Sequence, residues 1–222
     1  MILKVDSVVE RSEELVQGKK TAARAPMRLA KLLRGLEAKF DAKIAAAYGD
    51  VEILEIAYDS RRVKPGSLFV AIRGEKADGN HFVPDAVARG AVAIVSEEPL
   101  PAALPKKFPW IQVAEARKAL AILGANYFGR PAEVLKLIGV TGTNGKTTTS
   151  YLVDSVLRAA GCRVALLGTI GHRLVVETRP ASNTTPESLD LQEFLGDVVL
   201  AGGTHAVLEA SSHALAMDRL WG

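Results

Sequence analysis

The feature that most constrains this chain is a glycine-containing loop between an apolar run and an amphipathic segment. The loop reads Val140-Thr-Gly-Thr-Asn-Gly-Lys-Thr-Thr148. The run Val134–Thr141 predicts a strand, and Arg163–Leu167 predicts the next strand along the chain. Between them, one face of a helix that ends at Gly161 is predicted by Leu152, Val153, Val156, Leu157 and Ala160. Strand, loop, helix and strand in this order build a parallel sheet.

The residue types in the loop are those that hold a phosphate chain. Gly142 and Gly145 allow a tight turn whose N–H groups face an anion, and the helix that follows adds the positive end of its dipole. Lys146 supplies a charge for the β- and γ-phosphates, and the Thr147 hydroxyl is placed to bind Mg²⁺. A standard loop has glycine where Val140 stands, so this is a shortened variant. An unliganded glycine turn is the alternative, but the strand, helix and hydroxyls favour a triphosphate. We therefore expect ATP to be bound by Gly142, Thr143, Asn144, Gly145, Lys146, Thr147 and Thr148.

Further polar residues are expected at the same edge of the sheet. Ala206–Leu208 predicts a strand, and Glu209 stands at its carboxyl end, where open α/β sheets bind ligands. We expect Glu209 to bind Mg²⁺, the alternative being a surface carboxylate. Ser211 to His213 would line the same crevice. Thr185-Pro186 predicts a helix start with Thr185 as the N-cap. The buried face of that helix is predicted to be Leu191, Phe194, Leu195 and Val198.

Composition excludes several classes of protein. The first 43 residues carry ten Lys or Arg and six Asp or Glu, so their net charge is +4, and the rest of the chain is near −1. With only 5% aromatic residues, this basic end favours a solvated face over a nucleic-acid site. No apolar stretch approaches the roughly 18 residues of a membrane span. Cys162 is the only cysteine, and the four histidines lack metal-site spacing to one another. We expect a soluble cytoplasmic protein, with no nucleic acid or membrane partner.

The chain divides in two at Gly129-Arg-Pro131. Residues 1–26 show no clear period and are expected to form an extension. Residues 27–129 mix helical and strand signals, with strands expected at 51–58, 67–72 and 91–95 and helices at 29–36, 82–89 and 116–127. Residues 130–222 contain the loop. We expect an α/β protein, a small N-terminal domain being followed by a P-loop-type parallel-sheet domain.

Four blocks of this sequence together resemble the Mur ligases. The loop within Gly139–Thr149 is similar to their ATP loop, and Tyr58-Asp-Ser-Arg-Arg-Val-Lys-Pro-Gly66 resembles their UDP-binding domain. Asn183-Thr-Thr-Pro186 resembles the block that contacts the muramoyl peptide. Glu209-Ala-Ser-Ser-His213 resembles a block of the central domain. The match runs from about Met27 to Gly222 and is nearest to the member that adds the third amino acid.

The resemblance implies roles for individual residues. UDP-sugar contacts are implied for Tyr58, Ser60, Glu75, Lys76 and Ala77, although the last three fit a solvated turn equally well. Contacts to the muramoyl dipeptide are implied for Asn183, Thr184, Thr185, Ser211 and Arg219. Lys146 and Glu209 would be catalytic, and Thr147 and Glu209 would bind Mg²⁺.

The implied activity is an ATP-dependent amide ligation. ATP would phosphorylate the terminal carboxylate of UDP-N-acetylmuramoyl-L-alanyl-D-glutamate, and the amine of diaminopimelate or lysine would attack the acyl phosphate. Family members carry a third domain and a carbamylated lysine, both expected beyond Gly222. We therefore expect an incomplete, monomeric chain that is inactive alone. Two alternatives stay open: a non-catalytic UDP-sugar- and nucleotide-binding module, and a ligase similar to folylpolyglutamate synthase.

Overall fold

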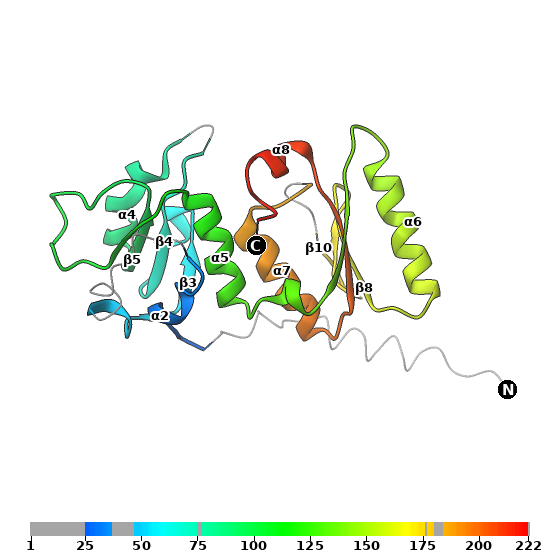
Figure 1. The fold of residues 1–222 in the computed structure, drawn as a ribbon, viewed down its shortest axis with the longest axis horizontal. Coiled ribbons are helices and arrows are strands. Elements are labelled where there is room, and N and C mark those ends of the chain that lie inside the picture. The colour runs from blue at the N-terminus through cyan, green and yellow to red at the C-terminus, as the bar shows by residue number, and fades with distance from the viewer. Residues whose placement is uncertain (1–24, 37–46, 75–76, 176, 180–183, 222) are drawn as a thin grey trace.

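The computed structural model describes residues 25–36, 47–74, 77–175, 177–179 and 184–221. The described chain forms two α/β units side by side, each built on its own sheet (Figure 1). No helix in these ranges has the length and apolarity needed to span a bilayer.

The first unit is a sheet of four parallel strands in the order β3-β4-β5-β6. Its strands are short apolar runs buried on both faces, as parallel strands covered by helices must be. One face packs with α2 and α5, and the other with α4. The elements are β3 (Glu55–Ala57), β4 (Ser67–Val70), β5 (Ala91–Ser96), β6 (Trp110–Gln112), α2 (Leu29–Leu32), α4 (Val83–Ala88) and α5 (Ala116–Tyr127).

The single strand predicted at 51–58 is wrong, because the structure divides it at Leu54. Its first part, β2 (Glu52–Ile53), pairs antiparallel with β1 (Met27–Arg28) in a separate ribbon. Its second part, β3, joins the main sheet. The buried side chains on either side of the break, Ile53 and Ala57, belong to different sheets. One run of alternating residues is therefore divided between two sheets.

The second unit is a five-stranded sheet in the order β10-β9-β8-β11-β7. Strands β8, β11 and β7 are parallel, which confirms the predicted parallel sheet, whereas β9 and β10 add an antiparallel hairpin that was not predicted. The elements are β7 (Lys136–Val140), α6 (Lys146–Ala159), β8 (Val164–Leu167), β9 (His172–Arg173), β10 (Thr178–Arg179), α7 (Ser188–Leu200), β11 (His205–Glu209) and α8 (Ser212–Ala216).

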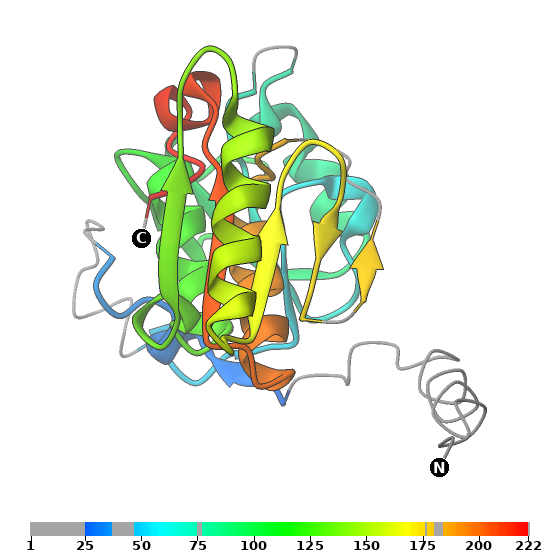
Figure 2. The ribbon, with the colours of Figure 1, turned by 90° about the vertical axis from the view of Figure 1, so that its right-hand side faces the viewer.

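Helix α6 lies across one face of this sheet and α7 lies on the other (Figures 1 and 2). The predicted buried face of α7 is confirmed, because all four of its side chains are buried. The face predicted for α6 is covered at only two of its five positions, and Ala160 is exposed. Val153 and Leu157 pack against the sheet, but Leu152 and Val156 are 63% and 68% exposed. Within the described ranges, the main neighbours of α6 are the strands β7, β8 and β11, so the side of the helix that faces away from the sheet is exposed.

Helices α5 and α7 pack together between the two sheets and join the units (Figure 1). The predicted N-cap of α7 is wrong by two residues. The helix begins at Ser188, and its cap is Glu187, whose side chain accepts a hydrogen bond from the Ser188 N–H. The Thr185 hydroxyl instead donates to the backbone oxygen of Glu209 at 2.7 Å. The Thr185 hydroxyl thus makes a long-range hydrogen bond in place of the helix cap that the local pattern predicts.

Candidate functional site

The glycine loop connects β7 directly to α6 at one edge of the second sheet. Gly142 and Gly145 have φ angles of +144° and +78°, which L side chains rarely adopt, so both glycines are required by the backbone. Gly145 is the N-cap of α6, and the loop is exposed. The Lys146 amine donates to the Gly142 carbonyl oxygen at 2.7 Å. The loop therefore presents unpaired N–H groups at a helix N-terminus, together with a lysine, to solvent.

Strand register brings Glu209 to this loop. In the parallel pair β11–β7, Glu209 is the partner of Val140, the residue at which the loop begins. The Thr147 hydroxyl donates to Glu209 Oε2 at 3.0 Å, so two residues separated by 62 positions meet at the carboxyl ends of neighbouring strands. Glu209 is 1% exposed, which excludes the surface-carboxylate alternative.

The carboxylate of Glu209 is held by neutral donors. Besides Thr147, the Thr169 N–H donates to Oε1 at 3.2 Å and the Thr169 hydroxyl donates to Oε2 at 3.1 Å. No ion pair to Glu209 is formed within the described ranges. A buried carboxylate without a cationic partner is costly, and it fits a site at which a cation binds.

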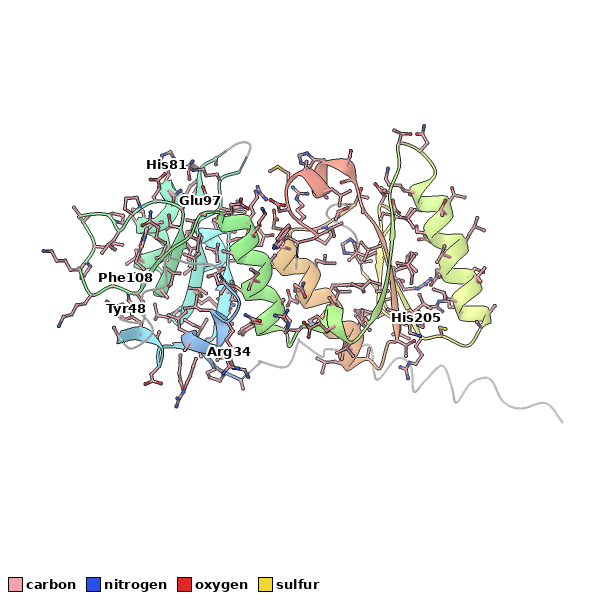
Figure 3. All side chains as sticks on the ribbon, in the orientation of Figure 1. Arg34, Tyr48, His81, Glu97, Phe108 and His205 are labelled. Atoms are coloured by element: carbon pink, nitrogen blue, oxygen red, sulfur yellow. The ribbon has the colours of Figure 1, made fainter. Side chains whose placement is uncertain are left out.

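The donor set suits Mg²⁺. This ion takes oxygen ligands, and it commonly binds through one or two carboxylates together with substrate phosphates. Thr147 and Glu209 supply hydroxyl and carboxylate oxygens beside the loop. No group of three or more His, Cys, Asp or Glu side chains that could hold a metal ion occurs among the residues described. Two of the histidines, His81 and His205, lie in different units (Figure 3).

The segment that begins with Thr184 and Thr185 is connected to Glu209 by hydrogen bonds on two sides. Thr184 Oγ1 lies 3.1 Å from Thr169 Oγ1, and Thr185 is bonded to the Glu209 backbone oxygen. The Ser211 N–H donates to the Thr185 hydroxyl at 3.3 Å, and Arg219 donates to the Thr185 carbonyl oxygen at 3.3 Å. The predicted residues Thr184, Thr185, Ser211 and Arg219 are therefore gathered beside Glu209. Ser211 uses its own hydroxyl to cap α8.

A cavity of about 430 Å³ lies in the first unit. Tyr58, Ser60 and Ala77 line it, together with Asp59, Arg61 and residues of the 72–82 segment. The Arg61 guanidinium lowers the pKa of Asp59 by hydrogen bonding to its carboxylate. Burial, and then the hydrogen bond to Asp190, raise the pKa of the Tyr58 hydroxyl. Glu75, Lys76 and Asn183 were also predicted as site residues, but they lie outside the described residues.

Two polar links between the first unit and the start of α7 are not predicted by the sequence. Tyr58 donates to Asp190 at the start of α7. Arg117 of α5 donates to Glu187 at 2.9 Å, and Arg219 lies 3.6 Å from the same oxygen. No spacing rule signals these pairs. Thr169, by contrast, could have been found, because it stands two residues after a predicted strand, near the same carboxyl ends at which Glu209 was expected.

Comparisons with known proteins agree with this geometry. Residues 52–128 match the model "Mur ligase family, catalytic domain", and residues 140–222 match "Mur ligase middle domain". The chain belongs to the Mur ligase family. Both matches fall on the described sheets, so the family resemblance and the parallel-sheet fold class are confirmed.

Several Mur ligases share this part of the fold and sequence. A UDP-N-acetylmuramoyl-L-alanyl-D-glutamate–2,6-diaminopimelate ligase of Solibacter usitatus is 53% identical over 83% of this chain and 37% of the relative. The enzyme of the same name from Listeria monocytogenes is 45% identical over 78% of this chain and 34% of its own length. A solved structure with that name is 29% identical, with a TM-score of 0.68, over 89% of this chain and 38% of that one. The chain thus spans little more than a third of these relatives.

Proposed function

We propose that this chain is the UDP-sugar- and ATP-binding part of an ATP-dependent amide ligase of peptidoglycan synthesis. The ligase joins a diamino acid, diaminopimelate or lysine, to UDP-N-acetylmuramoyl-L-alanyl-D-glutamate. The observation that carries the proposal is the contact between Thr147, in the glycine loop, and the buried Glu209. The names of the relatives support the substrates, and diaminopimelate is the amino acid those names print.

The two units take separate tasks in this proposal. Residues 27–129 bind the UDP-sugar in the cavity lined by Tyr58, Ser60 and Ala77. Glu75 and Lys76 are proposed to contact the same ligand. Residues 130–222 bind ATP, and residues 1–26 are an extension. Asn183, Thr184, Thr185, Ser211 and Arg219 hold the muramoyl dipeptide next to Glu209. The protein works as a monomer in the cytoplasm.

The chemistry requires two anions to be brought together. The N–H groups of Gly142–Thr148 and the amine of Lys146 hold the β- and γ-phosphates. Thr147 and Glu209 would hold Mg²⁺, which would supply positive charge against the phosphates. The substrate carboxylate attacks the γ-phosphorus, an O–P bond to ADP breaks, and an acyl phosphate forms. The amine then attacks the carbonyl carbon, phosphate leaves with the bonding pair, and the amine loses a proton. This chain's residues position the carboxylate and screen its charge.

Binding and turnover test different parts of the proposal. By isothermal titration calorimetry, the 222-residue chain should bind UDP-N-acetylmuramoyl dipeptide and MgATP at separate sites. Lys146→Ala should weaken only MgATP binding. A version extended to the length of the relatives should form ADP only when the dipeptide and a diamino acid are both present. Absence of ADP under these conditions would overturn the ligase assignment.

Two other functions are decided by the same measurements. Binding of both ligands without ADP formation by the extended protein would indicate a non-catalytic binding module. Failure of the first unit to bind UDP would favour a folylpolyglutamate synthase-like ligase, whose substrate is not a UDP-sugar. The match of residues 52–128 to a Mur ligase model supports the UDP-sugar reading.

A further inference from the structure

We propose that Thr169 is a positioning residue that couples the Mg²⁺ carboxylate of Glu209 to the substrate block at Thr184. This inference rests on the proposed function. It concerns a residue in the turn after β8 that touches both halves of the site: Glu209 on one side and Thr184 on the other.

The direction of the hydrogen bonds follows from the carboxylate. An ionised carboxylate only accepts, and a hydroxyl has one proton to give. Thr169 gives its proton to Glu209 Oε2, so in the Thr169–Thr184 contact it must accept, and Thr184 must donate. The series of hydrogen bonds therefore runs from Thr184 through Thr169 to Glu209. The Thr184 oxygen keeps its lone pairs for the substrate side.

Thr169 also fixes the orientation of the carboxylate. Its N–H and its hydroxyl bond to the two different oxygens of Glu209, which together hold the carboxylate plane. Thr147 bonds to the same oxygen as the Thr169 hydroxyl, Oε2. Groups that orient a metal ligand commonly contribute 10- to 100-fold, roughly, to metal affinity. Thr169 is the only residue of the described chain that holds both carboxylate oxygens of Glu209.

Close packing behind Glu209 shows that this orientation is built into the fold. Gly168 precedes Thr169, and a Cβ placed on it would lie 2.2 Å from Glu209 Oε1. Leu167 is the register partner of Leu208, so Gly168 lies beside Glu209 at the edge of the sheet. The glycine thus leaves the space that lets the carboxylate reach the Thr169 N–H.

The test is the Mg²⁺ dependence of ATP binding to the 222-residue chain, measured by calorimetry in excess Mg²⁺ and in EDTA. Thr169→Val keeps the size and the N–H but removes the hydroxyl. We expect it to lower the affinity for MgATP about 10-fold or more while leaving the affinity for ATP in EDTA unchanged. Thr169→Ser restores the hydroxyl and should restore the Mg²⁺ dependence. Thr178→Val, an exposed position in β10, is the matched control.

The outcomes separate the two claims. If the unaltered chain binds ATP without any Mg²⁺ dependence, the Mg²⁺ site of the proposed function fails, and this inference fails with it. If the unaltered chain shows the dependence and Thr169→Val shows it equally, the inference alone is overturned. A Thr169→Ser variant that behaves like Thr169→Val would also overturn it, because the hydroxyl would then not be the group that matters. Thermal denaturation of each variant identifies any loss of fold.

Discussion

At the scale of single residues, the site is organised around one carboxylate. Glu209 is buried, lacks a cationic partner among the described residues, and accepts hydrogen bonds from Thr147 and Thr169. Burying a charge in this way destabilises the unliganded protein, and a bound cation relieves the cost. The role proposed for Glu209 and the stability of the unliganded protein are therefore opposed at this position.

Gly168→Ala tests how tightly Glu209 is held. The new methyl group would overlap Glu209 Oε1, and the carboxylate can yield only by breaking its hydrogen bonds. We expect a loss of about 1–3 kcal/mol in the free energy of unfolding, measured with urea, and weaker MgATP binding. Gly139→Ala is the matched control, because nothing lies within 4 Å of a Cβ there. Equal stability of the two variants would contradict the packing described.

At the scale of elements, α6 and α7 cover opposite faces of one sheet but are buried to different extents. Helix α7 lies between the two sheets and is packed on both sides, while α6 covers a sheet whose edge strand, β7, is exposed. Both helices carry apolar residues with helical spacing. Periodicity alone therefore does not tell how much of a helix face is covered.

Leu→Ala substitutions in the two helices make this difference measurable. Leu195, in α7, is 2% exposed, and its truncation should lower the free energy of unfolding by about 2–5 kcal/mol. Leu152, in α6, is 63% exposed, and its truncation should change that free energy by less than about 0.5 kcal/mol. Urea denaturation of both variants gives the comparison. A large effect at Leu152 would mean that its side chain is covered in solution.

At the scale of the whole molecule, polar side chains link the first unit to the start of α7 in the second unit. Glu187 forms an ion pair with Arg117 of the first unit and lies close to Arg219 of the second unit. All three side chains are at most 21% exposed. Tyr58 and Asp190 form a second link. Because both links involve the start of α7, they fix the residues that follow Thr185 relative to the cavity at Tyr58.

Glu187→Gln should loosen this connection. It leaves two largely buried guanidinium groups without their counter-charge, at a cost of about 3 kcal/mol in the free energy of unfolding. Glu133→Gln removes the same charge from an exposed pair with Arg130 and should cost less than about 1 kcal/mol. Urea denaturation compares the two variants. Similar losses would show that the interdomain pair is no stronger than a surface pair.

Tyr58 predicts a dependence on alkaline pH. Its pKa is raised in the folded protein, mainly by burial and then by Asp190, so folding favours the protonated hydroxyl. The stability from this group is complete below the unfolded pKa of about 10 and is lost as the pH rises above it. Tyr58→Phe should lower the free energy of unfolding by about 2 kcal/mol at neutral pH.

The control for this prediction is Tyr151→Phe, at a side chain that is 39% exposed. Melting temperatures between pH 8 and pH 11, roughly, bracket the unfolded pKa. The Tyr58→Phe variant should lose less stability than the unaltered protein over this range, and Tyr151→Phe should follow the unaltered protein. Parallel curves for all three proteins would contradict the role given to the Tyr58–Asp190 bond.

The sequence by itself determined the features that depend on neighbouring residues. Gly142 and Gly145 imply positive φ angles, and apolar periodicity implies the strands and helices around the loop, because backbone sterics and the helical repeat act locally. Only the tertiary structure decided that Glu209 meets Thr147, that β7 lies at an edge, and that Thr185 bonds to Glu209 instead of capping α7. These depend on strand order and register, which bring together residues far apart in the chain. No local pattern encodes that choice.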